Sequence, residues 1–298
     1  MLKQRITTAL VLLPAVFFLL FLVRLDFFAG LILVVVYLMA LEWAKLSEFK
    51  KQTHWSFYAL LISFVNLAIW YFSESLVVWP SLSWPHHIQM DLPLLVLLGA
   101  LFIIFLCIVI VLSFSINKRW WQNRNIKSLF GLVLLPAFFV SFISIRQTGY
   151  PALPGVGDFT YGGKLLLFML LLIWAADIGA FVTGKLLGRH KLTKVSPNKT
   201  WEGVIGGVLL SVLIGLTGIS VLKLQVDNRL VYLLVLLSLA TISVFGDLFE
   251  SALKRAANIK DSGNLLPGHG GLLDRLDSTI TVAPVFYLSF SYFEWFNG

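Results

Sequence analysis

The chain has 298 residues, of which 58% are hydrophobic and only 13% are charged, and it holds 23 Lys and Arg against 15 Asp and Glu. Soluble domains carry about 25% charged residues. This composition, arranged in apolar runs, therefore predicts an integral membrane protein and excludes a soluble enzyme and a disordered tail. The single cysteine, Cys107, lies in an apolar run, which excludes a disulfide scaffold and a cysteine-rich zinc site.

Nine apolar segments are long enough, or nearly so, for a helix to cross a hydrocarbon core of about 30 Å. Helices are expected because a helix satisfies its backbone hydrogen bonds within itself. We therefore predict an all-α, polytopic integral membrane protein with about nine transmembrane helices. The segments lie at about residues 6–23, 27–46, 55–72, 92–116, 128–145, 165–184, 203–222, 230–249 and 279–295.

The distribution of Lys and Arg predicts the orientation. If the chain changes side at each span, 18 of these residues lie on the side of the N-terminus and 5 on the other. The positive-inside rule then places the N-terminus in the cytoplasm and the C-terminus outside. We divide the chain into an N-terminal scaffold part, residues 1–150 with about five spans, and a catalytic part, residues 151–298 with about four spans. The cytoplasmic loops of the catalytic part are 185–202 and 250–278.

Two carboxylates fall within the apolar segments. Glu42 lies near the inner end of the second segment, where pairing with Lys45 or snorkelling is favoured over a functional role. Asp177 lies deeper, seven residues from the inner end of the sixth segment. A carboxylate there costs about 2.5–3.5 kcal/mol on insertion scales, so we expect it to face the bundle or a wet cavity. A functional role is favoured for Asp177 over an interhelical hydrogen bond.

The loop after the sixth segment carries five cations between residues 185 and 199. Such a cluster enforces topology and contacts anionic lipid, or it binds a phosphate group. The run Ser196-Pro197-Asn198-Lys199-Thr200 favours a shaped site, because Ser-Pro and Pro-Asn specify a turn that presents Lys199. A helix that starts shortly afterwards would also offer free N–H groups to phosphate.

The most informative segment is 246–278. The eighth span ends near Asp247 and the ninth begins near Thr279 on the same face, so the intervening loop can bring Asp247 beside Asp274 and Asp277. Clustered oxygen ligands without cysteine suit Mg²⁺ or Mn²⁺. For a single residue the alternative is a structural one, since Asp277 or Ser278 could cap the ninth helix.

This segment resembles the signature of the phosphatidate cytidylyltransferases, also called CDP-diacylglycerol synthases. The signature reads Ser-x-apolar-Lys-Arg-x4-Lys-Asp, then a small residue, then His-Gly-Gly-apolar-x-Asp-Arg-apolar-Asp. It is filled here by Ser251, Leu253, Lys254, Arg255, Lys260, Asp261, Gly263, Pro267, His269, Gly270, Gly271, Leu272, Asp274, Arg275, Leu276 and Asp277. The resemblance extends to Asp177, to residues 196–203 and to Gly246-Asp247, and so covers about residues 170–280.

The resemblance implies transfer of CMP from CTP to phosphatidic acid, at the cytoplasmic face of a bacterial inner membrane. It implies a homodimer among membrane lipids, no nucleic-acid partner, and Mg²⁺ or Mn²⁺, alone or with a second monovalent or divalent cation. The implied catalytic residues are Asp247, Asp274, Lys199, Lys254 and Arg255, and the metal ligands are Asp247, Asp274 and Asp277. The implied binding residues for CTP and phosphatidate are Ser196, Asn198, Lys199, Thr200, Lys260, Asp261, His269, Gly270, Gly271, Arg275 and Asp177.

Two other functions have less support from the sequence. A CDP-alcohol phosphotransferase needs an Asp-x2-Asp-Gly-x2-Ala-Arg run, which this sequence lacks. An ion-coupled transporter is favoured only by Asp177, because transporter sites lie near the membrane midplane, whereas most polar groups here gather at one interface.

Overall fold

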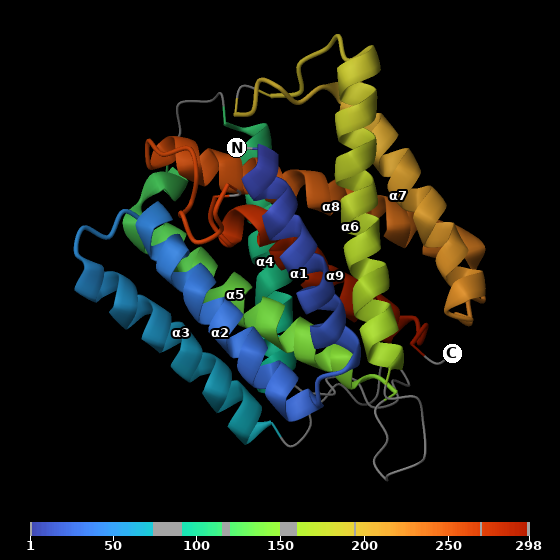
Figure 1. The fold of residues 1–298 in the computed structure, drawn as a ribbon, viewed down its shortest axis with the longest axis horizontal. Coiled ribbons are helices and arrows are strands. Elements are labelled where there is room, and N and C mark those ends of the chain that lie inside the picture. Colours follow the sequence, from blue (N-terminus) through green and yellow to red (C-terminus); the bar gives the residue numbers. More distant parts are fainter. Residues whose placement is uncertain are drawn as a thin grey trace.

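A computed structural model describes residues 2–73, 91–114, 120–149, 160–193, 195–268 and 270–296, leaving aside the side chains of residues 2–9, 11 and 12. Its described residues form nine α-helices and one short 3₁₀ turn, η1 (Trp120–Gln122). The helices are α1 (Leu2–Phe21), α2 (Leu25–Leu46), α3 (Gln52–Phe72), α4 (Leu92–Leu112), α5 (Arg124–Gln147), α6 (Tyr161–Leu187), α7 (Trp201–Val221), α8 (Arg229–Ala256) and α9 (Leu273–Tyr292). Figure 1 shows this bundle.

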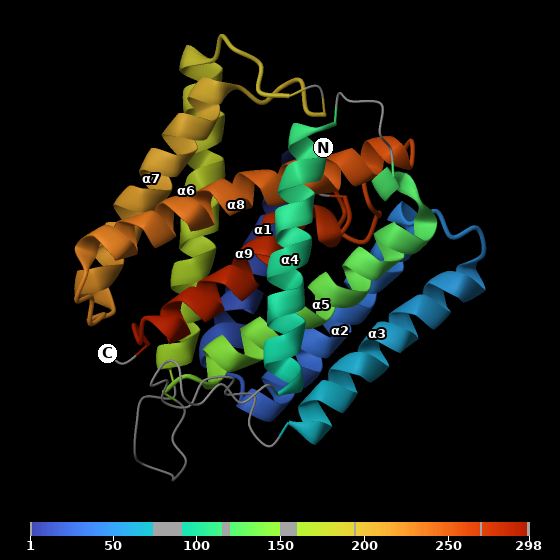
Figure 2. The ribbon, with the colours of Figure 1, turned by 180° about the vertical axis from the view of Figure 1, so that it is seen from behind.

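The all-α, multi-pass membrane fold is confirmed. Within the described residues, the seven helices α2 to α8 are long and apolar enough to cross a membrane, and each of the nine predicted segments coincides with a helix. In Figures 1 and 2 the N-terminus and the α6–α7 connection lie toward one end of the bundle, and the C-terminus lies toward the other. An odd number of alternating helices produces this arrangement.

Helix α5 is the most buried of the seven apolar helices and packs against α2, α4, α6 and α9. Aromatic side chains such as Phe138 and Phe139 fill this centre and are fully enclosed. The chain therefore has one continuous core, in which the first five helices support the last ones.

Helices α6 and α7 lie side by side in both ribbon views and pack more closely with each other than any other pair (Figures 1 and 2). Glycines make this approach possible: a Cβ atom on Gly179 would lie 2.7 Å from the backbone oxygen of Gly206. Ser211 adds a hydrogen bond across the pair, since its hydroxyl donates to the Leu172 carbonyl at 2.9 Å. The pair forms one wall of the cavity described next.

Candidate active site

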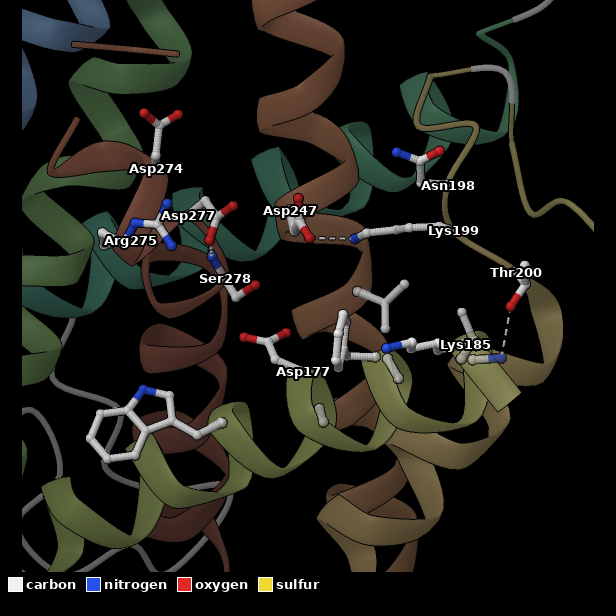
Figure 3. A pocket seen from close by; sticks show the side chains of 18 of the residues that line it. Asp177, Lys185, Asn198, Lys199, Thr200, Asp247, Asp274, Arg275, Asp277 and Ser278 are labelled. Carbon is white, nitrogen blue, oxygen red and sulfur yellow. Dashed lines mark hydrogen bonds and ion pairs between the residues drawn. The ribbon is translucent and has the colours of Figure 1, made fainter. Parts of the chain in front are cut away.

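A cavity of about 680 Å³ opens between α6, the loop that leads into α7, the end of α8 and the start of α9. Its volume falls in the range of about 300–1,000 Å³ that is typical of ligand pockets. Figure 3 shows that its polar side chains converge from these separate elements. The charged residues of the lining are Asp177, Lys185, Lys199, Asp247, Lys254, Asp261, Asp274, Arg275 and Asp277.

The α6–α7 loop holds Lys199 at the mouth of the cavity. The Lys199 N–H donates to the Ser196 carbonyl at 3.1 Å, which closes the turn, and the Lys199 carbonyl accepts the Leu192 N–H at 2.8 Å. The Thr200 hydroxyl oxygen then caps α7 by accepting the Gly203 N–H at 3.1 Å. The turn expected from the Ser-Pro-Asn sequence is thus present, and it directs the Lys199 ammonium to an ion pair with Asp247.

Three carboxylates from three helices line the inner part of the cavity. Asp247 extends from α8 and Asp277 from α9, and Asp177 projects from α6 toward both of them (Figure 3). The backbone N–H of Ser278 donates to Asp277 Oδ1 at 2.6 Å, and the Ser278 hydroxyl donates to the Ser243 carbonyl of α8 at 2.9 Å. The bond from Ser278 to Ser243 holds α9 against α8, so the loop does return beside its origin as the sequence predicts.

Two further acidic side chains, those of Glu250 and Asp274, contact Lys254. Its ammonium lies 2.8 Å from Asp274 Oδ1 and 2.5 Å from Glu250 Oε2, and all three side chains are almost fully buried. Asp274 Oδ2 also accepts the N–H groups of Gly271 at 2.8 Å and Ser262 at 3.0 Å. Burial by itself raises the pKa of Asp274, which precedes the apolar part of α9. The hydrogen bonds from Lys254 and Gly271 outweigh that effect and hold this pKa below its usual value.

The sequence predicts a divalent cation at these acidic residues, and their contacts bear on whether they fit such an ion. Within the part of the chain that the structure describes, no three His, Cys, Asp or Glu side chains form a ready ligand set. However, Mg²⁺ is commonly bound through one or two carboxylates together with substrate phosphates. The carboxylates of Asp247 and Asp277 face the cavity and fit that mode, Asp247 once the Lys199 ammonium moves away. Asp274 fits it only if the Lys254 ammonium moves away.

Some of the other predicted site residues line the cavity and some do not. Asp177, Asn198, Thr200, Asp261 and Arg275 line the cavity. The structure does not place Ser196, Arg255, Lys260, Gly270 or Gly271 in the lining. Gly270 has a φ of +88°, a conformation that favours glycine, and its N–H donates to the Leu266 carbonyl at 3.1 Å. His269 lies outside the described residues.

The sequence analysis missed two contributors to the site. Lys185 lines the cavity from the end of α6, although it was counted only as one cation of the loop. Glu42, assigned to pairing with Lys45 or to snorkelling, instead accepts hydrogen bonds from the start of α9. Its signal was the presence of a carboxylate in an apolar segment, but the partners lie more than 200 residues away and no local pattern identifies them.

The chain was compared with known proteins. The model of the cytidylyltransferase family matches residues 3–293. A phosphatidate cytidylyltransferase of Haemophilus influenzae is 36% identical over 99% of both chains, and one of Pseudomonas aeruginosa is 37% identical over 96% of both. Another from Bacillus subtilis is 38% identical over 55% of this chain and 59% of its own. With a match over nearly its whole length, this chain belongs to the cytidylyltransferase family.

Proposed function

We propose that this protein is a phosphatidate cytidylyltransferase of phospholipid biosynthesis. In that reaction a phosphate oxygen of phosphatidic acid attacks the α-phosphorus of CTP. The new P–O bond forms as the bond between the α-phosphorus and the bridging oxygen breaks, and that oxygen leaves with pyrophosphate. The products are CDP-diacylglycerol and pyrophosphate. The proposal is supported by the family match and by relatives of that name.

One observation carries the proposal at the level of the site: acidic and basic side chains from several helices line the same cavity within an apolar helix bundle. Both reactants are polyanions, so cations must offset their repulsion before the reacting atoms approach. A site of this kind must also reach a lipid and a water-soluble nucleotide. A cavity bounded by the membrane helices α6 and α8 and by the polar α6–α7 loop meets both requirements.

The cations of the lining are the proposed phosphate ligands. Lys185, Lys199 and Arg275 reach the cavity from three different elements, and a guanidinium can contact two phosphate oxygens at once. Asn198 and Thr200 lie beside Lys199 and add neutral polar groups. Binding of a phosphate by Lys199 would compete with its ion pair to Asp247, so nucleotide binding would free that carboxylate.

Asp247 and Asp277 are the proposed residues that hold Mg²⁺ or Mn²⁺, with Asp274 as a third ligand when Lys254 shifts to a substrate phosphate. When bound, such an ion neutralises phosphate charge and stabilises the leaving pyrophosphate. Asp177 faces the same carboxylates from α6 and completes the negative wall. A phosphate monoester has a second pKa of about 6 and is largely ionised at neutral pH, so we assign no general base.

Three further parts of the proposal extend beyond the cavity. Arg255 and Lys260 are exposed and follow or precede the lining residues Lys254 and Asp261 in the chain, and we assign them to attraction of the nucleotide. The excess of Lys and Arg on the side of the N-terminus supports a cytoplasmic active site at the inner membrane of a bacterium. The homodimer stays a prediction, which light scattering of the detergent-purified protein tests.

Transfer from differently labelled CTP tests the function. The purified protein is incubated with phosphatidic acid, Mg²⁺ and CTP that carries ³²P at either the α or the γ position. We expect α-label to enter the lipid fraction and γ-label to stay in water as pyrophosphate. γ-Label in the lipid indicates a different phosphotransfer, and label in the lipid from neither form refutes the proposal.

A further inference from the structure

Glu42 on α2 makes contacts that connect the first part of the chain to the signature segment. Its side chain is buried, and its carboxylate accepts the N–H groups of Leu272 at 3.1 Å and Leu273 at 2.8 Å, where α9 begins. It also accepts the hydroxyl of Ser262 at 3.1 Å. All three donors lie between 220 and 231 residues further along the chain.

The same short segments also hold the site residue Asp274. Ser262 donates its hydroxyl to Glu42 and its backbone N–H to Asp274. At the start of α9 the N–H of Gly271 points to Asp274, whereas those of Leu272 and Leu273 point to Glu42. The two carboxylates therefore accept from different groups of the same two segments, and the position of Asp274 in the cavity depends on the segments that Glu42 holds.

Two glycines of the signature lie against the Glu42 side chain. A Cβ atom on Gly263 would overlap Glu42 Oε1, and its other near neighbours also belong to the Glu42 side chain. A Cβ atom on Gly271 would overlap the Ser262 hydroxyl and lie 2.6 Å from Glu42 Oε2. Neither glycine is among the described residues with positive φ, so their backbone conformations are open to alanine. Steric exclusion by Glu42 therefore accounts for glycine at position 263, whereas Gly271 is enclosed by Ser262, Glu42 and the Gly263 backbone together.

We infer that Glu42 is a positioning residue for the active site, an inference that rests on the proposed cytidylyltransferase function. By holding Ser262 and the first turn of α9, the Glu42 carboxylate fixes the direction of Asp274 and of the neighbouring Arg275. The positive end of the α9 backbone and the N–H groups stabilise this buried carboxylate. It need not contact either substrate.

The test compares Glu42→Gln with wild-type protein in detergent. Gln keeps the size of the side chain but has one acceptor oxygen, and its NH₂ group cannot accept an N–H, so at least one buried donor loses its partner. We expect kcat/KM for CTP to fall by about 10- to 100-fold, as displacement of reacting groups by about 1 Å can cause. We also expect the KM for CTP to rise, which partial unfolding alone would not produce because it reduces only the amount of active enzyme.

Glu48→Gln is the matched control. Glu48 follows α2 and pairs with the fully buried Lys127, with 2.5 Å between the charged atoms, at a place outside the cavity lining. This variant should lower the thermal midpoint and leave the KM for CTP unchanged. An active wild-type protein together with a Glu42→Gln variant that has normal kcat and KM overturns the inference. If the wild-type protein transfers no cytidylyl group, the proposed function itself has failed.

A second pair of variants keeps the inference testable if Glu42→Gln does not fold. Gly263→Ala should impair transfer when Glu42 is present, because the new methyl group meets its carboxylate. In a Glu42→Ala background that space is empty, so adding Gly263→Ala should cause little further loss. Equal losses in the two backgrounds would show that the residues are not coupled and would overturn the inference.

Discussion

Lys254 lies between two carboxylates, and Lys254→Met tests how much of the site depends on this arrangement. The ammonium lies 2.5 Å from Glu250 and 2.8 Å from Asp274, and the three side chains are only 15%, 4% and 6% exposed. Methionine keeps the apolar stem but leaves two buried carboxylates without their cation. Breaking a buried pair by removing one partner costs about 3–5 kcal/mol.

Glu250→Gln is the informative comparison. The cluster holds two acids and one base, so this change leaves the neutral pair of Lys254 and Asp274 intact. The free energy of unfolding should then fall by about the contribution of one ordinary hydrogen bond, about 1 kcal/mol. At about 2 °C per kcal/mol for a chain of this size, the thermal midpoint should fall by roughly 6–10 °C in Lys254→Met and by about 2 °C in Glu250→Gln.

The midpoint is measured by loss of the monodisperse chromatographic peak after heating in detergent. CTP and divalent cations are left out, because bound ligands stabilise the native state by mass action. If the thermal midpoint fell by similar amounts in the two variants, the reasoning would be refuted, because removing the shared cation would then cost no more stability than removing one of its two acids. A normal midpoint in Lys254→Met would show that the cluster adds nothing to stability.

Three further predictions concern turnover. Asp247→Asn should lower cytidylyl transfer by about 10²-fold, as loss of a key electrostatic stabiliser does, and should raise the Mg²⁺ concentration needed for half-maximal transfer; an unchanged rate and Mg²⁺ requirement would exclude Asp247 as a metal ligand. Asp274→Asn should keep membrane insertion but lower transfer by at least about 10²-fold, and near-normal turnover would remove this residue from the mechanism. Lys199→Ala should mainly raise the KM for CTP or phosphatidate, and an unchanged kcat and KM would leave the loop with a topological role only.

The helices could be predicted well from the sequence because membrane insertion imposes a length and an apolar composition on each span. The approach of Asp247 to Asp277 was also predictable, since a loop that leaves and re-enters the same face must return to its origin. The position of Lys199 was predictable as well, because Pro197 and Asn198 define the turn that presents this residue.

The partners of the buried charges could not be predicted. A lysine in a signature motif is read as a phosphate ligand, but Lys254 lies between Glu250 and Asp274. Glu42 with Lys45 three residues later has the spacing of a local helical pair, yet its carboxylate contacts Ser262 and the start of α9. Both outcomes depend on packing between distant helices, which local spacing does not encode.

The placement of α9 has a consequence for biogenesis. This helix supplies Asp274 and Asp277 to the cavity and packs against α2, α4, α5 and α8, all of which are synthesised earlier. A nascent chain that has inserted only α1 to α8 therefore still lacks the residues that α9 contributes to the cavity lining. Under the proposed function, transfer can begin only after α9 has docked onto helices that are already in the bilayer.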